Sequence, residues 1–204
     1  IKPQITGTVL GQLPPLNSHQ LVISIVAGID MSSLQDWLPQ GQPIVRCMPN
    51  TPALLGAGIT GLFANREVSA QQREAASQIL NSVGSSVWVD QEAQLDAVTA
   101  VSGSGPAYFF LLMESMVASA QKLGLDPSIS RQLVVETARG AALMACQPGA
   151  DPATLRRNVT SPGGTTEAAL NTMQAQGLAD TVDTALHAAR DRAETLAVEF
   201  GSKA

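Results

Sequence analysis

The chain has 204 residues, 45% of them hydrophobic, and a formal net charge of -5. This length allows one or two domains with a buried core, and the acidic balance argues against a nucleic-acid surface or an anionic membrane as partner. No apolar run approaches the roughly 18 residues of a membrane span. The isolated Cys47 and Cys146 indicate a reducing cytoplasm rather than a disulfide scaffold.

Short apolar runs alternate with helix-like segments in residues 1–90. The first run, "LVISIV", is typical of a strand buried on both faces of a parallel sheet. Helices are predicted at 31–38 and from the N-cap Ser69 to Gly84. The predicted strands are 21–26, 43–48, 59–64 and 85–90. Strands that alternate with helices predict an α/β layer.

Strand signals stop after residue 90, so an all-helical region is predicted for 91–204. The Asp-Pro pairs at 126–127 and 151–152 predict helix starts, with Asp as cap and Pro in the first turn. A last helix is predicted at about 178–200, ended by Gly201.

Residues 105–124 form a segment that is apolar almost all round, which predicts a helix buried on every side. Few other helices are available to cover it, and a partner subunit is the economical source of that cover. We therefore expect an interlocked helical dimer. The alternative is a monomeric bundle wrapped around this helix.

The stretch "GAGITG" at 56–61 fits the G-x-G-x-x-G pattern of dinucleotide pyrophosphate loops. Such a loop should follow a buried strand and open a helix. Here a proline-broken "PNTPALL" precedes it and a strand-like "ITGLFA" follows it. The context favours a glycine-rich approach to a strand over a phosphate loop.

A second glycine cluster, "SGSGPAY" at 102–108, stands between two helix-like segments. It is either an interhelical turn or a place where hydroxyls line a pocket. The residues leave both interpretations open. The hydroxyl-bearing residues here are Thr99, Ser102, Ser104 and Tyr108.

The third cluster, "TSPGGTTEAAL" at 160–170, places two glycines before a predicted helix start. Exposed backbone N–H groups at a helix N-terminus can bind a carboxylate or phosphate. An ordinary helix start, with Glu167 satisfying the helix dipole, is favoured when the residues are taken alone.

Other chemistries have little support. His19 and His187 lie far apart, and neither has metal-ligand spacing with a cysteine, so no metal is expected. No histidine stands near a plausible nucleophile. Arg156 and Arg157 are most simply a solvated face. These observations suggest that a cofactor supplies the chemistry.

Four stretches in this order resemble the pyrroline-5-carboxylate reductase family: "IKPQ", "CMPNTPALLGAGITGLFAN", "LDAVTAVSGSGPAYFFLLMESM" and "NVTSPGGTTEAAL". The resemblance runs essentially from Ile1 to the end. It implies an oxidoreductase acting on a CH–NH bond, which reduces 1-pyrroline-5-carboxylate to L-proline with NADPH or NADH in the last step of proline biosynthesis.

The resemblance also implies an α/β Rossmann-like N-terminal domain, incomplete here, over 1–90, and an all-α dimerisation and substrate domain over 91–204. It implies a cytoplasmic homo-oligomer: a dimer, with a decamer of dimers as a larger form. The family's pyrophosphate loop lies before "KPQ", so about 60 residues, roughly two βα units, are expected to precede Ile1. "GAGITG" matches the segment after the family's "CMPNTP" loop.

Site residues are carried over position by position. The resemblance makes Thr99 and Ser104 catalytic hydroxyls near the imine, which hold or relay a proton. The implied cofactor-binding residues are Lys2, Pro3, Ala27, Gly28, Asn50, Glu92 and Asn158. The implied substrate-carboxylate seat is Ser161, Gly163, Gly164, Thr165 and Thr166, with the N–H groups of the two threonines as donors.

Two other functions remain as alternatives. Without a pyrophosphate loop, the polypeptide would be a non-catalytic oligomerising scaffold. A dehydrogenase acting on a hydroxy acid is the other, but such enzymes usually place a lysine near the reacting carbon on the first buried helix. Lys122 lies at the opposite end of that helix from "SGSGPAY".

Overall fold

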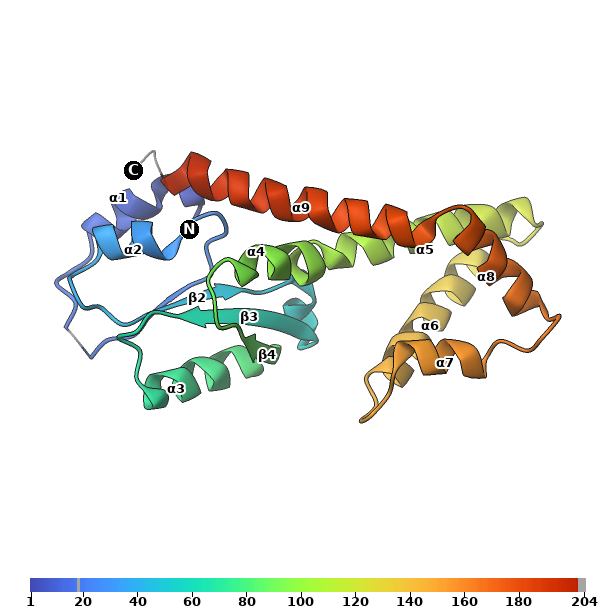
Figure 1. Cartoon of the computed structure of the whole chain (residues 1–204), viewed down its shortest axis with the longest axis horizontal. Helices are drawn as coiled ribbons and strands as arrows, with labels where there is room; N and C mark the ends of the chain where they lie inside the picture. The colour runs from blue at the N-terminus through green and yellow to red at the C-terminus, as the bar shows by residue number, and fades with distance from the viewer. Residues whose placement is uncertain (18, 202–204) are drawn as a thin grey trace. The chain divides into compact units, whose positions relative to one another are not determined.

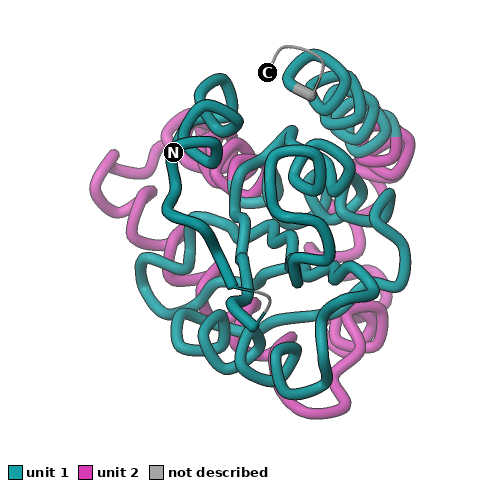
Figure 2. Tube along the Cα trace, turned by 90° about the vertical axis from the view of Figure 1, so that its left-hand side faces the viewer, with its two compact units in different colours: residues 1–106, 184–204 teal, residues 107–183 magenta. Residues whose placement is uncertain are grey.

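The computed structural model describes residues 1–17 and 19–201, which form two compact units. Unit 1 comprises residues 1–106 together with 184–204, and unit 2 comprises 107–183 (Figure 2). Residues 91–106 and 184–201 therefore belong to the same unit as the sheet, although the sequence pattern divided the chain at residue 90.

A four-stranded sheet in the order β1-β2-β3-β4 forms the centre of unit 1 (Figure 1). β1 pairs with β2, and β3 with β4, in parallel, whereas β2 and β3 are antiparallel. The predicted α/β layer is thus present, with a mixed sheet. The strands are β1 Val22–Ser24, β2 Ile44–Met48, β3 Gly58–Ala64 and β4 Gly84–Trp88.

The antiparallel pair follows from the short connection between β2 and β3. This connection holds only the 3-10 helix η2, Thr51–Leu55, whereas a parallel crossover needs a dozen or more residues. Gly56 ends η2 in the left-handed conformation, and β3 starts at Gly58. "GAGITG" therefore leads into a strand and opens no helix, as its context predicted.

β1 is shorter and less buried than predicted. It is the first strand in the sheet order, so it has one neighbouring strand, β2. Val22 and Ile23 are half-buried, and Ile25, inside the predicted strand, is 59% exposed. The prediction of a strand buried on both faces was therefore wrong for the described chain, because an apolar run does not reveal how completely other elements cover the two faces of a strand.

The core lies on both faces of the sheet, because adjacent residues of a strand point to opposite faces. On β2, Ile44 packs with the residues around helix α2, Met31–Trp37, and Val45 packs with the residues of helix α3, Ala70–Asn81. The predicted cap Ser69 is confirmed: its side chain accepts from the backbone N–H of Gln72, in a capping box.

Two short elements near the N-terminus were not predicted. They are the 3-10 helix η1, Pro3–Ile5, and helix α1, Thr6–Gly11. The sequence "TGTVLG" has low helix propensity because of its glycines and β-branched residues. Leu10 packs against the core residues near α2, so tertiary contacts stabilise this helix.

The described residues after β4 are helical, as predicted. Asp126 and Asp151 cap α6 and α7 by accepting hydrogen bonds from the backbone N–H groups of Ser128 and Thr154. The elements are α4 Gln94–Val98, the π-helix η3 Thr99–Gly103, α5 Gly105–Lys122, α6 Pro127–Ala145, α7 Pro152–Asn158, α8 Thr165–Ala175 and α9 Leu178–Gly201.

α5 is largely exposed within the chain, in agreement with the expectation that a partner subunit covers it. Gly105 is its one buried residue, whereas Phe109, Phe110 and Leu111 are 66%, 62% and 63% exposed. The chain's own helices therefore leave the apolar surface of α5 open, which argues against the monomeric bundle. Among the described residues, none of the helices has the length and hydropathy of a membrane span.

Candidate active site

A pocket of about 200 Å³ lies in unit 1 beyond the carboxyl ends of the parallel strands β1 and β2. Residues Val26–Gly28 follow β1, and Arg46–Met48 end β2. α4, η3 with its C-cap residue Ser104, and α9 supply the other walls. The space beyond the carboxyl ends of parallel strands is where open α/β sheets bind ligands.

The pocket brings together four of the predicted site residues. Ala27 and Gly28, predicted beside the cofactor, share its lining with Thr99 and Ser104, predicted to be catalytic. The two pairs are separated by some 70 positions in sequence but share one pocket because α4 packs against β2. Roughly 300–1,000 Å³ is usual for a drug-sized ligand, so this pocket is too small for a whole dinucleotide.

A π-helical turn sets the positions of Thr99 and Ser104. The Ser104 N–H donates to the Thr99 carbonyl at 2.8 Å, and the Thr99 hydroxyl donates to the Leu95 carbonyl at 2.8 Å. "SGSGPAY" is therefore neither an open turn nor a regular α-helix. π-turns of this kind are frequent at functional sites.

Gly103, inside the same turn, allows a close approach to β2. A Cβ at this position would lie 2.5 Å from the terminal methyl carbon of Met48, which also lines the pocket. The glycine thus lets η3 pack directly on the strand end.

Gly28 has a structural reason to be glycine. Its φ is +74°, and a Cβ there would lie 2.9 Å from Cδ2 of Phe200 on α9. Leu196 of α9 is also within contact distance. The neighbouring Ala27 is exposed, so it is the more accessible part of this loop.

Glu92, predicted to bind the cofactor, is engaged inside the protein. Its Oε1 accepts a hydrogen bond at 2.6 Å from the backbone N–H of Met31, and it forms an ion pair with Arg46. The side chains of Arg46 and Glu92 are 12% and 30% exposed. Glu92 therefore ties the N-terminus of α2 to β2, and Arg46 is the member of this pair that reaches the pocket.

The other predicted cofactor residues do not line this pocket. Lys2 precedes η1, which begins at Pro3, and its carbonyl accepts from the Thr6 hydroxyl. Asn50 donates from Nδ2 to the Ser102 carbonyl at 3.1 Å and accepts from the Ile59 N–H at 3.0 Å. Asn50 thus joins β3 to η3 and supports the pocket wall from behind.

Asp96 and Arg192 line the pocket and were missed in the sequence. Burial raises the pKa of Asp96 and Arg46 lowers it, while Glu194 and Glu92 raise it, and the net pKa is higher than usual. A signal was available for Asp96, which stands three residues before Thr99 on a helix and so shares its face. No signal marked Arg192, which comes from the distant α9.

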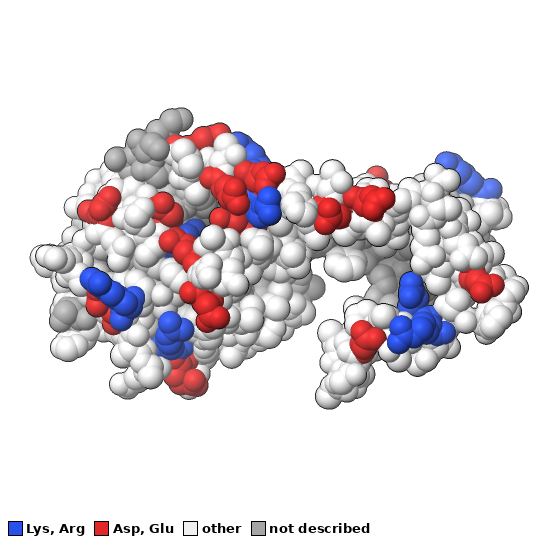
Figure 3. Space-filling view, viewed as in Figure 1, with Lys and Arg blue, Asp and Glu red and all other residues white. Residues whose placement is uncertain are grey.

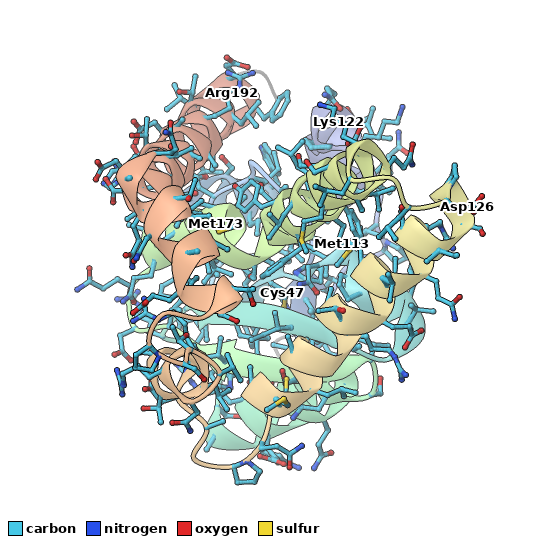
Figure 4. All side chains as sticks on the ribbon, turned by 90° about the vertical axis from the view of Figure 1, so that its right-hand side faces the viewer. Cys47, Met113, Lys122, Asp126, Met173 and Arg192 are labelled. Carbon is cyan, nitrogen blue, oxygen red and sulfur yellow. The ribbon has the colours of Figure 1, made fainter. Side chains whose placement is uncertain are left out.

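Cys47, on β2, also lines the pocket (Figure 4). Burial raises the pKa of its thiol to about 12. The side chain is therefore a neutral, unreactive packing group at neutral pH.

In unit 2, the "SPGGTT" loop leads into α8, which begins at Thr165. Gly163 has a φ of +71°, and Gly164 is the N-cap of α8. The N–H groups of Thr165 and Thr166 lie in the first turn and have no partner within the helix. The Gly163 N–H donates to the Glu167 carboxylate at 2.7 Å, so this loop already holds a carboxylate supplied by the chain.

Asn158, the remaining predicted cofactor residue, is the last residue of α7 and is exposed. Basic side chains gather over α7 (Figure 3), where Arg156 and Arg157 occupy its last turn. Both arginines are exposed and line a shallow groove with Glu167. Neither is part of the pocket in unit 1.

Comparisons with known proteins agree with this arrangement. Residues 92–196 match the family described as pyrroline-5-carboxylate reductase dimerisation. The chain is 54% identical over 202 residues to the pyrroline-5-carboxylate reductase of Pseudomonas aeruginosa, covering 98% of this chain and 74% of that protein. The corresponding protein of Haemophilus influenzae is 44% identical over 202 residues.

Solved structures give the same result. The structure of a pyrroline-5-carboxylate reductase from Coxiella burnetii matches with a TM-score of 0.92 and 41% identity, over 96% of this chain and 73% of that chain. The Plasmodium falciparum pyrroline carboxylate reductase, solved with NADP bound, matches with a TM-score of 0.86 and 33% identity, over 97% of this chain and 79% of that chain.

The fold and the pocket define a protein in which a Rossmann-type sheet, with its site beyond the strand ends, is followed by a helical dimerisation region. Within that class, the chain belongs to the pyrroline-5-carboxylate reductase family.

Proposed function

We propose that this protein reduces 1-pyrroline-5-carboxylate to L-proline with NADPH or NADH, and that the reaction takes place at the pocket in unit 1. The observation that carries this proposal is the meeting of Ala27, Gly28, Thr99 and Ser104 beyond the ends of β1 and β2. The membership of the reductase family agrees with it.

The residues present fit the nicotinamide end of the cofactor. The pocket is too small for a whole dinucleotide, and Val26–Gly28 form one wall of it. When bound, the reduced nicotinamide supplies the hydride that the imine carbon accepts. Ala27 and Gly28 would hold the ring against the substrate, so most of the catalysis is positioning.

Thr99 and Ser104 would contact the imine nitrogen from the opposite wall. Because the Thr99 hydroxyl hydrogen is directed to the Leu95 carbonyl, the oxygen of Thr99 offers a lone pair to the pocket. Thr99 can therefore accept a hydrogen bond from the N–H of the iminium, and this bond favours the protonated form of the substrate.

We also propose that the "SPGGTT" loop binds the substrate carboxylate through the N–H groups of Thr165 and Thr166. The bond from the Gly163 N–H to Glu167 supports the ability of this loop to accept a carboxylate. A helix N-terminus with two glycines can do this without a basic side chain.

We propose that the chain forms a dimer through residues 91–204 and that a decamer built from such dimers is a larger form. We propose the cytoplasm as its location. The open apolar surface of α5 and the match to the family's dimerisation region support the dimer. The free cysteines Cys47 and Cys146 agree with a reducing compartment. Sedimentation of the purified protein distinguishes a dimer from a decamer.

The test of the activity is oxidation of NADPH by the full-length protein in the presence of pyrroline-5-carboxylate, followed as loss of NADPH absorbance. Formation of L-proline in equal amount is the expected result. No turnover by a folded dimer would favour the oligomerising scaffold. The hydroxy-acid dehydrogenase has no support in the pocket lining, because Lys122 is the last residue of α5 (Figure 4) and is not among the residues that line the pocket.

A further inference from the structure

Three charged side chains line the pocket in unit 1: Arg46, Asp96 and Arg192. Arg46 is paired with Glu92, and Arg192 donates to Glu199 at 2.9 Å. In the described part of the chain, no hydrogen bond or ion-pair contact reaches the carboxylate of Asp96. Of these three charged side chains, Asp96 is therefore the one whose carboxylate oxygens are available to contact a ligand.

Asp96, in α4, comes three residues before Thr99, the first residue of η3, so the two side chains lie on the same helical face. Both side chains line the pocket, together with Ser104. Since the Thr99 hydroxyl donates to Leu95, an unactivated hydroxyl is not the best source of a proton here. A carboxylic acid is a far stronger acid than an alcohol, and Asp96 is placed beside it.

The surroundings of Asp96 also favour its acid form. Burial and the carboxylates of Glu194 on α9 and Glu92 before α4 raise its pKa, and Arg46 on β2 opposes them. Arg192 on α9 is the other charged group of the lining. A carboxyl with a raised pKa is better matched to general acid catalysis near neutral pH.

We propose that Asp96 is the general acid of this pocket: it protonates the imine nitrogen of the substrate and then pairs, as a carboxylate, with the iminium cation. This role rests on the reductase activity proposed above. Thr99 accepts from the same N–H and keeps the ring in place.

In this step each bond that forms is matched by one that breaks. The O–H bond of the Asp96 acid breaks and an N–H bond forms on the neutral imine, which leaves an iminium beside a carboxylate. The hydride adds to the ring carbon, and the electron pair of the C=N π bond becomes the lone pair of the amine nitrogen. That nitrogen then takes a proton from water to form the ammonium group of proline, and solvent reprotonates Asp96.

The same geometry predicts how ligands are distinguished. L-proline carries a cationic ring nitrogen that would pair with the Asp96 carboxylate, whereas cyclopentanecarboxylate has the ring and the carboxylate but no nitrogen. Removing the charge of Asp96 should therefore affect the binding of proline alone. A side chain with a structural role would affect both ligands.

The experiment uses the full-length protein with Asp96→Asn, Asp96→Glu and the control Asp36→Asn, an exposed acid of α2 in the same unit. Turnover of pyrroline-5-carboxylate is measured against pH, and calorimetry measures the binding of L-proline and cyclopentanecarboxylate. Asp96→Asn should lower kcat/KM about 100-fold, within the range of general acid catalysis, and remove the Asp96 limb of the pH profile. It should also weaken proline binding about tenfold, as expected for a lost charge-assisted contact.

Binding of cyclopentanecarboxylate, and every property of Asp36→Asn, should stay as in the wild type. Asp96→Glu should keep the acid limb with reduced turnover, because it retains a carboxyl on a longer side chain. An unchanged pH profile in Asp96→Asn, or equal weakening of both ligands, would overturn the proposal. Absence of turnover in the wild-type protein would instead overturn the proposed function and this role with it.

Discussion

The backbone N–H of Ser104 donates to the carbonyl of Thr99 at 2.8 Å, which closes a π-helical turn at the end of α4. The turn adds one residue to a helical repeat, so two hydroxyl residues five positions apart both reach the same pocket. A regular α-helix would turn residues at this spacing apart by about 140°, given 3.6 residues per turn.

The first prediction concerns these two hydroxyls. Ser104→Ala and Thr99→Ala should each lower kcat about 10- to 100-fold with a small change in KM, since they act on the reacting nitrogen rather than on overall binding. Thr99→Ser, which keeps the hydroxyl, is the matched control and should stay within a few-fold of the wild type. Steady-state kinetics on folded variants measure this, and unchanged turnover in either alanine variant would refute the role of that residue.

Gly28 gives a prediction about stability. Gly28→Ala must place a Cβ 2.9 Å from Phe200 at a φ of +74°, so it should cost about 2–4 kcal/mol of unfolding free energy. Gly41→Ala is a matched control because Gly41 has a φ of +78° and no atom within 4 Å of the added carbon. It should cost only the backbone strain, about 1 kcal/mol.

Urea denaturation of the two variants measures the difference between them. Shortening Phe200 in the Gly28→Ala background should recover part of that difference, since it removes the side chain that the new methyl group meets. Equal losses in Gly28→Ala and Gly41→Ala would show that α9 does not pack on this loop in solution.

The strands and caps could be predicted because their causes are local. Ser69, Asp126 and Asp151 each accept from a backbone N–H two or three residues away, so the residues that form the contact are adjacent in sequence. Arg46 and Arg192 could not be assigned to the pocket in this way. Their place in the lining depends on β2 and α9 packing together with α4, which no local pattern reports.

Glu92 shows what a family resemblance leaves out. The resemblance implies a cofactor contact, which stays a prediction, and the structure adds bonds to Met31 and Arg46. These partners lie 61 and 46 positions away in sequence, on α2 and β2, so the motif around Glu92 could not predict them.

Asp30 gives a prediction about pH. It caps α2 by accepting from the Ser33 N–H at 2.8 Å. Burial raises the pKa of Asp30. The hydrogen bonds from Ser33 and the charge of Arg46 together lower it by more, so the net pKa lies below its ordinary value. The charged form is thus the one that stabilises the fold. Its contribution is full above the unfolded pKa of about 3.9 and is lost as the pH falls through the lower folded pKa.

Asp30→Ala should therefore lose about 1 kcal/mol of unfolding free energy at neutral pH, as is typical of a lost N-cap. The difference from the wild type should shrink once the pH falls below about 4. Asp36→Ala, an exposed acid of the same helix, is the control and should show little change. A constant difference between wild type and Asp30→Ala down to the lowest pH would contradict the assigned pKa direction.

The last prediction concerns Glu167 and the "SPGGTT" loop. Its carboxylate accepts from the Gly163 N–H at 2.7 Å, next to the Thr165 and Thr166 N–H groups that are proposed to bind a ligand carboxylate. Glu167→Ala should therefore tighten the binding of L-proline and of cyclopentanecarboxylate alike, about 3- to 10-fold, because a like charge is removed from beside the ligand carboxylate. The helix start should lose a few tenths of a kcal/mol of stability, since an acidic side chain leaves its first turn.

Calorimetry with both ligands separates this effect from that of Asp96, which acts on proline alone. Weaker binding of both carboxylates in Glu167→Ala would show that Glu167 orders the loop for its ligand rather than repelling it.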